Sequence, residues 1–134
     1  GEFCALGESL NFFAKTNDNP KAAILGAAVE TATQAVLNKN RSPSRKVGEE
    51  DNRTSHFYFA LYWAKALAKQ KQDIEISNYF EKIAKSLEEN EEKIIEELIA
   101  LQGKEVDLGG YFHTDPIKVR KIMRPSETLN QIIP

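Results

Sequence analysis

The sequence is poor in the residues that build disulfide frameworks, metal centres and membrane spans. A single cysteine, Cys4, excludes an intramolecular disulfide and fits a reducing, cytoplasmic setting. The two histidines lie far apart, so no metal site with clustered ligands is expected, and His56 should cap or border the core. The longest apolar run, residues 57–64, is too short to cross a bilayer, so no membrane partner is expected.

The sequence also lacks a large excess of charge of either sign, and it lacks the common catalytic motifs. The net charge is −2, whereas nucleic-acid-binding domains usually carry a clearly basic face, so no nucleic-acid partner is expected. There is no Walker loop, no Gly-x-Gly-x-x-Gly and no nucleophile elbow, and therefore no complete catalytic constellation. The acidic runs at residues 88–92 and 96–97 resemble metal ligands in composition only, and a solvated helix face accounts for them.

What is present is a helical pattern long enough for one core. Apolar residues recur at spacings of three and four, which predicts an all-α fold in a single helical unit, residues 1–134. The expected helices cover residues 2–15, 20–38, 52–70, 73–88, 91–102, 116–123 and 127–132, with residues 104–114 irregular. The helix 52–70, capped by Asp51 or Asn52, is apolar on nearly all sides, so it should be the central one.

A polar loop, residues 41–51, precedes that helix and is called the basic loop below. Together with the first turn of the helix it contains four cations: Arg41, Arg45, Lys46 and Arg53. Two interpretations stay open on spacing alone. The cations pair with Glu49, Glu50 and Asp51 as ordinary surface charge, or the loop binds a phosphate, with guanidinium forks and the flanking serine hydroxyls as donors.

Residues 42–64 read SPSRKVGEEDNRTSHFYFALYWA. This stretch resembles the monomeric type of NADP-dependent isocitrate dehydrogenase. Residues 1–3, 88–94, 107–111 and 123–126 are similar to further segments of that family, so the resemblance covers essentially the whole chain. The helical pattern begins at residue 2 without an initiating methionine, and we therefore expect a piece cut from a longer polypeptide.

The resemblance implies the helical C-terminal part of the small domain of a larger two-domain α/β enzyme. That enzyme converts isocitrate to 2-oxoglutarate with NADP and Mg or Mn, and its metal ligands and acid–base residues are expected outside this chain. The family pattern places one cofactor contact here, Arg45 on the 2′-phosphate of NADP. Arg53 ranks lower as a helper, because Asp51 or Glu49 could hold it in a structural pair.

Three further expectations follow from the resemblance. The isolated chain should be catalytically inactive, its main partner should be the remainder of the same polypeptide, and the surface exposed by the cut should favour self-association. The alternative hypothesis is a stand-alone helical interaction module whose basic loop binds an acidic partner.

Overall fold

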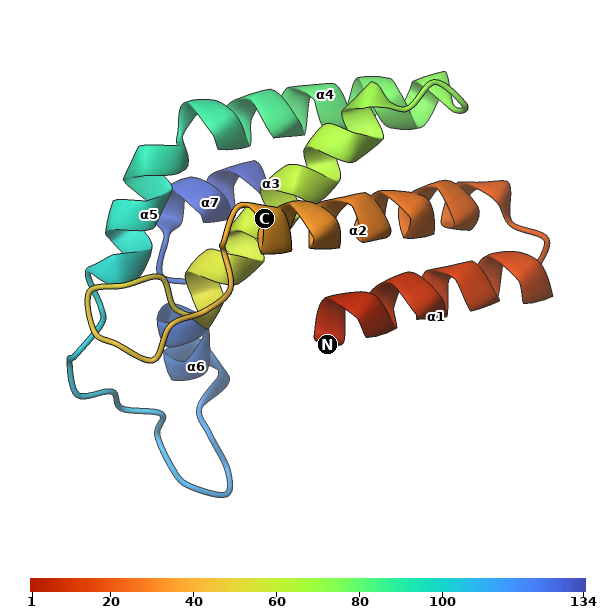
Figure 1. Ribbon diagram of the computed structural model, residues 1–134. Coiled ribbons are helices and arrows are strands. Elements are labelled where there is room, and N and C mark those ends of the chain that lie inside the picture. The colour runs from red at the N-terminus through yellow and green to blue at the C-terminus, as the bar shows by residue number, and fades with distance from the viewer.

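The computed structural model describes all 134 residues and contains seven helices (Figure 1). They are α1 (Glu2–Thr16), α2 (Pro20–Asn38), α3 (Asn52–Lys69), α4 (Ile74–Glu89), α5 (Glu91–Ile99), α6 (Pro116–Met123) and α7 (Glu127–Ile132). No strand is present, so the all-α prediction is confirmed. The predicted bounds agree within one residue for every helix except α5.

The predicted helix 91–102 was too long, because α5 ends at Ile99 and a turn follows. The N–H of Gln102 bonds to the carbonyl of Ile99 at 2.9 Å, a tighter spacing than an α-helix would use. The side chain of Gln102 then reaches the basic loop. The turn after α5 therefore contacts a segment more than 50 residues earlier in the chain.

Helices α1 and α2 form an antiparallel pair that lies side by side (Figure 1). Asn19 caps α2 by accepting a hydrogen bond from the N–H of Ala22 at 3.1 Å, and Pro20 takes the first helical position. A Cβ atom on Gly26 would come within 2.3 Å of Asn11 Oδ1 on α1. The absence of a side chain at Gly26 therefore allows α2 to pack closely against α1.

Helix α3 is the centre of the fold, as predicted. It packs against α2 on one side and α4 on the other, and α5 and α7 close the remaining end (Figure 1). The largest fully buried side chains gather around it, namely Phe57, Leu61, Leu67, Leu87, Ile94, Leu98 and Val29. None of the seven helices combines the length and apolarity that a bilayer span would require.

Candidate anion-binding site

The basic loop is closed at its base by a cation–carboxylate pair. Arg41 forms an ion pair with Glu50, and its guanidinium lies 4.1 Å from the ring centre of Tyr58 on α3. The N–H of Ser44 donates to the carbonyl of Glu50 at 2.7 Å, so the backbone also closes on itself. The loop is therefore a compact element attached to the central helix.

Gln102, in the turn after α5, fastens the other side of the loop. Its Oε1 accepts from the N–H of Gly48 at 2.7 Å, and its Nε2 donates to the carbonyl of Glu49 at 2.8 Å. Sequence reasoning missed this residue, because nothing in the local pattern links position 102 to position 48. The loop is thus held from two directions.

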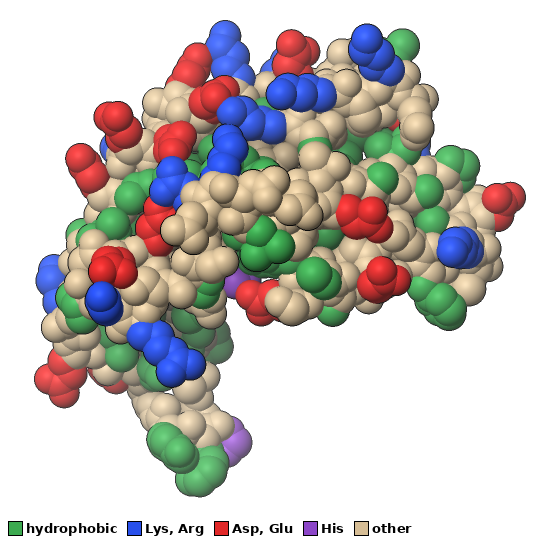
Figure 2. Space-filling view, viewed as in Figure 1, with side chains coloured by type: hydrophobic (Ala, Val, Ile, Leu, Met, Phe, Trp, Pro, Cys, Tyr) green, Lys and Arg blue, Asp and Glu red, His purple; other side chains and the backbone are tan.

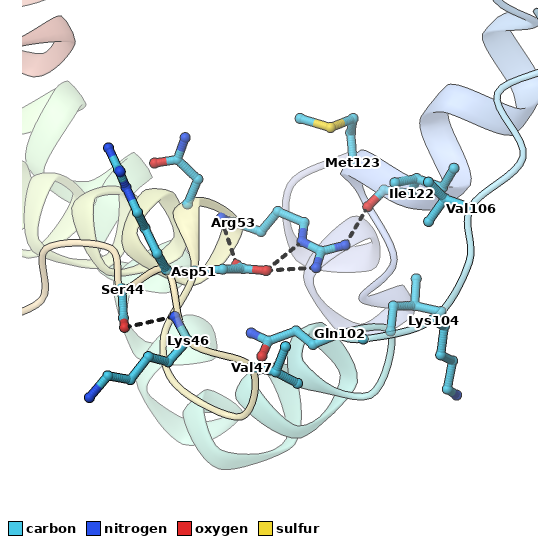
Figure 3. A pocket seen from close by; sticks show the side chains of 14 residues that line it. Ser44, Lys46, Val47, Asp51, Arg53, Gln102, Lys104, Val106, Ile122 and Met123 are labelled. Atoms are coloured by element: carbon cyan, nitrogen blue, oxygen red, sulfur yellow. Dashed lines mark hydrogen bonds and ion pairs between the residues drawn. The ribbon is translucent and has the colours of Figure 1, made fainter.

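Asp51 and Arg53 join the loop to α3 and α6 (Figure 3). Asp51 Oδ1 caps α3 by accepting from the N–H groups of Arg53 and Thr54 at 2.9 and 3.2 Å. Its Oδ2 receives Arg53 Nε and Nη2 at 3.0 and 2.6 Å, while Arg53 Nη1 donates to the carbonyl of Ile122 at 2.8 Å. Arg53 therefore has the structural pair that the sequence analysis offered as one alternative.

Burial and hydrogen bonding oppose one another at Asp51. Burial raises the pKa of Asp51, but the hydrogen bonds from Arg53 and from the backbone of Thr54, with the charge of Arg53, outweigh it. The pKa of Asp51 consequently lies below its usual value, and the carboxylate stays charged beside the guanidinium. This junction keeps the start of α3 and the end of α6 in place.

A cavity of about 410 Å³ opens between the basic loop, the start of α3, the turn after α5 and the end of α6 (Figure 3). Four cations line it, Arg45, Lys46, Arg53 and Lys104, against one acid, Asp51. Lys46 lies 3.9 Å from Glu49 with most of its side chain in solvent. The cavity therefore carries an excess of positive charge, which favours an anion.

Arg45 is the cation of the basic loop that has no acidic partner in the fold. Its side chain is exposed, and its guanidinium forms no ion pair or hydrogen bond, whereas Arg41, Lys46 and Arg53 each have an acidic partner. Of the two interpretations, the surface-pairing one describes three of the four cations. Arg45 is the one whose fork is free for a phosphate.

The flanking serines do not add donors to this cavity. Ser44 lines it, but its hydroxyl donates to Glu49 Oε2 at 2.6 Å and accepts from the N–H of Lys46 at 3.1 Å. Ser42 lines a different cavity, beside Gly1 and Phe3. Lys104, which the sequence analysis did not select, lies on the cavity wall without an ion pair and supplies the positive charge instead.

The remaining candidate residue, His56, makes contacts within the fold. His56 is half exposed at the first turn of α3, with Nδ1 at 2.7 Å from the Asn52 carbonyl and Nε2 at 3.1 Å from Glu2. It borders the core, as expected, through its edge-to-face contact with Phe3. No group of three or more His, Cys, Asp or Glu side chains is placed to hold a metal ion.

Comparison with known sequences identifies the class of protein. Residues 1–134 match the family described as monomeric isocitrate dehydrogenase. The chain belongs to that family, as the resemblance in residues 42–64 indicated. This membership favours the enzyme hypothesis over a stand-alone interaction module.

Curated relatives are each named as NADP isocitrate dehydrogenases. Isocitrate dehydrogenase [NADP] of Azotobacter vinelandii is 52% identical over 130 residues, which are 97% of this chain and 18% of the relative. Isocitrate dehydrogenase [NADP] 2 of Colwellia maris is 51% identical over 133 residues, 99% of this chain and 18% of the relative. Isocitrate dehydrogenase [NADP] 2 of Mycobacterium tuberculosis is 42% identical over 130 residues, which are 97% of this chain and 17% of the relative. The chain thus spans less than a fifth of these relatives.

Proposed function

We propose that this chain is the C-terminal helical part of the small domain of an NADP-dependent isocitrate dehydrogenase. In that enzyme the basic loop would hold the 2′-phosphate of NADP through Arg45. The 2′-phosphate is the group that distinguishes NADP from NAD, and a guanidinium fork suits its oxygens. The proposal therefore assigns this segment a role in cofactor choice.

The free guanidinium of Arg45 is the observation that carries this proposal. The other cations of the loop region each lie beside a carboxylate, that of Glu50, Glu49 or Asp51, so a dianionic phosphate would be attracted to Arg45 and to Lys104 on the cavity wall, and of these two only Arg45 has a guanidinium fork. The two anchors of the loop, Arg41 and Gln102, reduce the entropy lost when Arg45 engages a ligand. The cavity's net positive charge supports the same assignment.

The remaining parts of the reaction are assigned to the rest of the polypeptide. A Mg or Mn ion bound there would polarise the ketone for the loss of carbon dioxide. The isolated chain should catalyse nothing, because the family resemblance places the metal ligands and acid–base residues elsewhere. A cytoplasmic location suits the exposed free thiol of Cys4.

The test is calorimetric titration of the full-length enzyme with NADP, and with NAD as control. Arg45→Met removes a charge-assisted contact worth about 1.5–3 kcal/mol, so NADP should bind about 10- to 150-fold more weakly. NAD and isocitrate affinities should change little. Lys46→Met is the matched control, since it removes a neighbouring cation that already has a carboxylate nearby.

An unchanged ratio of NADP to NAD affinity in Arg45→Met would remove Arg45 from the site. If Arg45→Met and Lys46→Met weaken NADP equally, the loop acts as a diffuse positive charge without a specific ligand. If the unmodified full-length protein binds neither nucleotide and does not oxidise isocitrate, the proposed function itself fails.

A further inference from the structure

The segment between α5 and α6 carries two aromatic side chains far from the core. Tyr111 is 91% exposed and Phe112 is 88% exposed, the highest values among the large hydrophobic residues of the chain. The loop extends well away from the helices (Figure 1), and hydrophobic side chains gather at its end beside a histidine (Figure 2). We call Tyr111 and Phe112 the aromatic tip.

Hydrogen bonds hold the base of this loop in place. The N–H of Asp115 donates to the carbonyl of Leu108 at 2.7 Å, which closes the segment between them. Asp107 accepts from the N–H of Gly109 at 2.8 Å and from Lys118 Nζ on α6 at 2.6 Å. The orientation of the tip is therefore coupled to α6.

Two glycines allow the backbone to turn where the tip begins. Gly109 has a φ of +80°, and a Cβ atom there would lie 2.7 Å from the Cβ of Asp115. A Cβ on Gly110 would lie 2.6 Å from the carbonyl oxygen of His113. The rings of Tyr111 and Phe112 meet edge to face, with centroids 5.0 Å apart. A closely packed backbone turn thus exposes Tyr111 and Phe112 to solvent as an aromatic pair that is already in contact.

The chemistry of the tip fits an apolar protein surface. Residues 108–114 contain no Lys, Arg, Asp or Glu, so the tip has no fixed charge for lipid headgroups or nucleic-acid phosphates. Aromatic side chains are common anchors at protein interfaces. The relatives are more than five times as long as this chain, which leaves ample protein of the same polypeptide to receive it.

We propose that the aromatic tip inserts into an apolar recess on the remainder of the same polypeptide and anchors this helical unit to it. The inference rests on the proposed function, in which the chain is one part of a longer enzyme. A recess that accepts Tyr111 and Phe112 would restrain α6 through Asp107 and Lys118. The end of α6 in turn contacts Arg53 through Ile122, so docking also supports the anion cavity.

Photocrosslinking in the full-length enzyme tests this contact. Benzoylphenylalanine is placed at position 112, and in a separate protein at position 79. Tyr79 is a matched control, because it is 66% exposed on α4 and also meets an adjacent aromatic, Phe80, edge to face at 5.1 Å. NADP-dependent isocitrate oxidation is measured first, so that a failure of the proposed function is seen separately.

The expected result is an efficient cross-link from position 112 to a peptide of the same polypeptide outside this segment, at several-fold higher yield than from position 79. A cross-link between two copies, a cross-link confined to this segment, or a yield no higher than at position 79 would overturn the proposal. In parallel, Tyr111→Ser with Phe112→Ser should shorten the thermal half-life of the active enzyme several-fold, whereas Tyr79→Ser should leave it unchanged.

Discussion

Replacing Asp51 tests whether the junction between the basic loop and α3 is structural. Asp51 does two things at once, because one oxygen caps α3 and the other holds Arg53. The two roles are separable by substitution. Asp51→Asn keeps an oxygen for the cap and removes the charge, while Asp51→Ala removes both.

The magnitudes come from the contacts. Losing an N-cap costs about 1 kcal/mol of unfolding free energy. The Arg53 side chain is 16% exposed, and Asp51 is its one acidic partner. An ion pair of this intermediate burial, once broken, costs about 1–2 kcal/mol, between the values for surface and fully buried pairs. We therefore expect about 2–3 kcal/mol for Asp51→Ala and about 1–2 kcal/mol for Asp51→Asn.

The same pair predicts a pH dependence. The pKa of Asp51 is lower in the folded chain than in the unfolded chain, where it is about 3.9. A carboxylate of this kind stabilises the fold above its unfolded-state pKa, and the contribution is lost as pH falls through the folded-state pKa. The difference between wild type and Asp51→Asn should be constant near neutral pH and shrink below about pH 4.

Urea denaturation followed by circular dichroism measures these free energies. Glu81→Ala is the control, because Glu81 is an exposed carboxylate of α4 without an ion pair, and it should change stability by less than about 0.5 kcal/mol. If Asp51→Asn costs no more than Glu81→Ala, the Arg53 pair is not a structural element. A cost that persists unchanged to low pH would contradict the assignment of the effect to the charge of Asp51.

Two other changes test the core and the loop anchor. Leu87 is fully buried, so Leu87→Ala should lower the unfolding free energy by about 2–5 kcal/mol. Leu87→Met should cost less than about 1.5 kcal/mol in the same urea assay. Equal costs for the two variants would argue against tight packing around Leu87. Gln102→Ala removes two hydrogen bonds to the basic loop, each worth about 1 kcal/mol, so the amide of Gly48 should exchange its hydrogen faster. Unchanged exchange at Gly48, measured by NMR, would mean that Arg41 and Glu50 hold the loop without help.

Much of the helical fold was predictable because its signals are local. Asn19 with Pro20 marks the start of α2, and Asp51 marks the start of α3, since each cap bonds backbone groups only two or three residues away. The apolar surface of α3 likewise indicated its central position, because a helix without a polar face must be covered on all sides. The end of α5 was not predictable in this way, since the side chain of Gln102 bonds to Gly48 and Glu49 of the distant basic loop.

The sequence by itself determined the class of fold, the helix starts, the central helix and the four cations of the basic loop region. Only the tertiary structure decided which of those cations is free, because each of Glu49, Glu50 and Asp51 has more than one cation nearby in the sequence. It also brought Gln102 and Lys104 to a loop more than 50 residues earlier. The enclosure of the cavity depends on distances between separate helices, and these distances exist only once the core around α3 has packed.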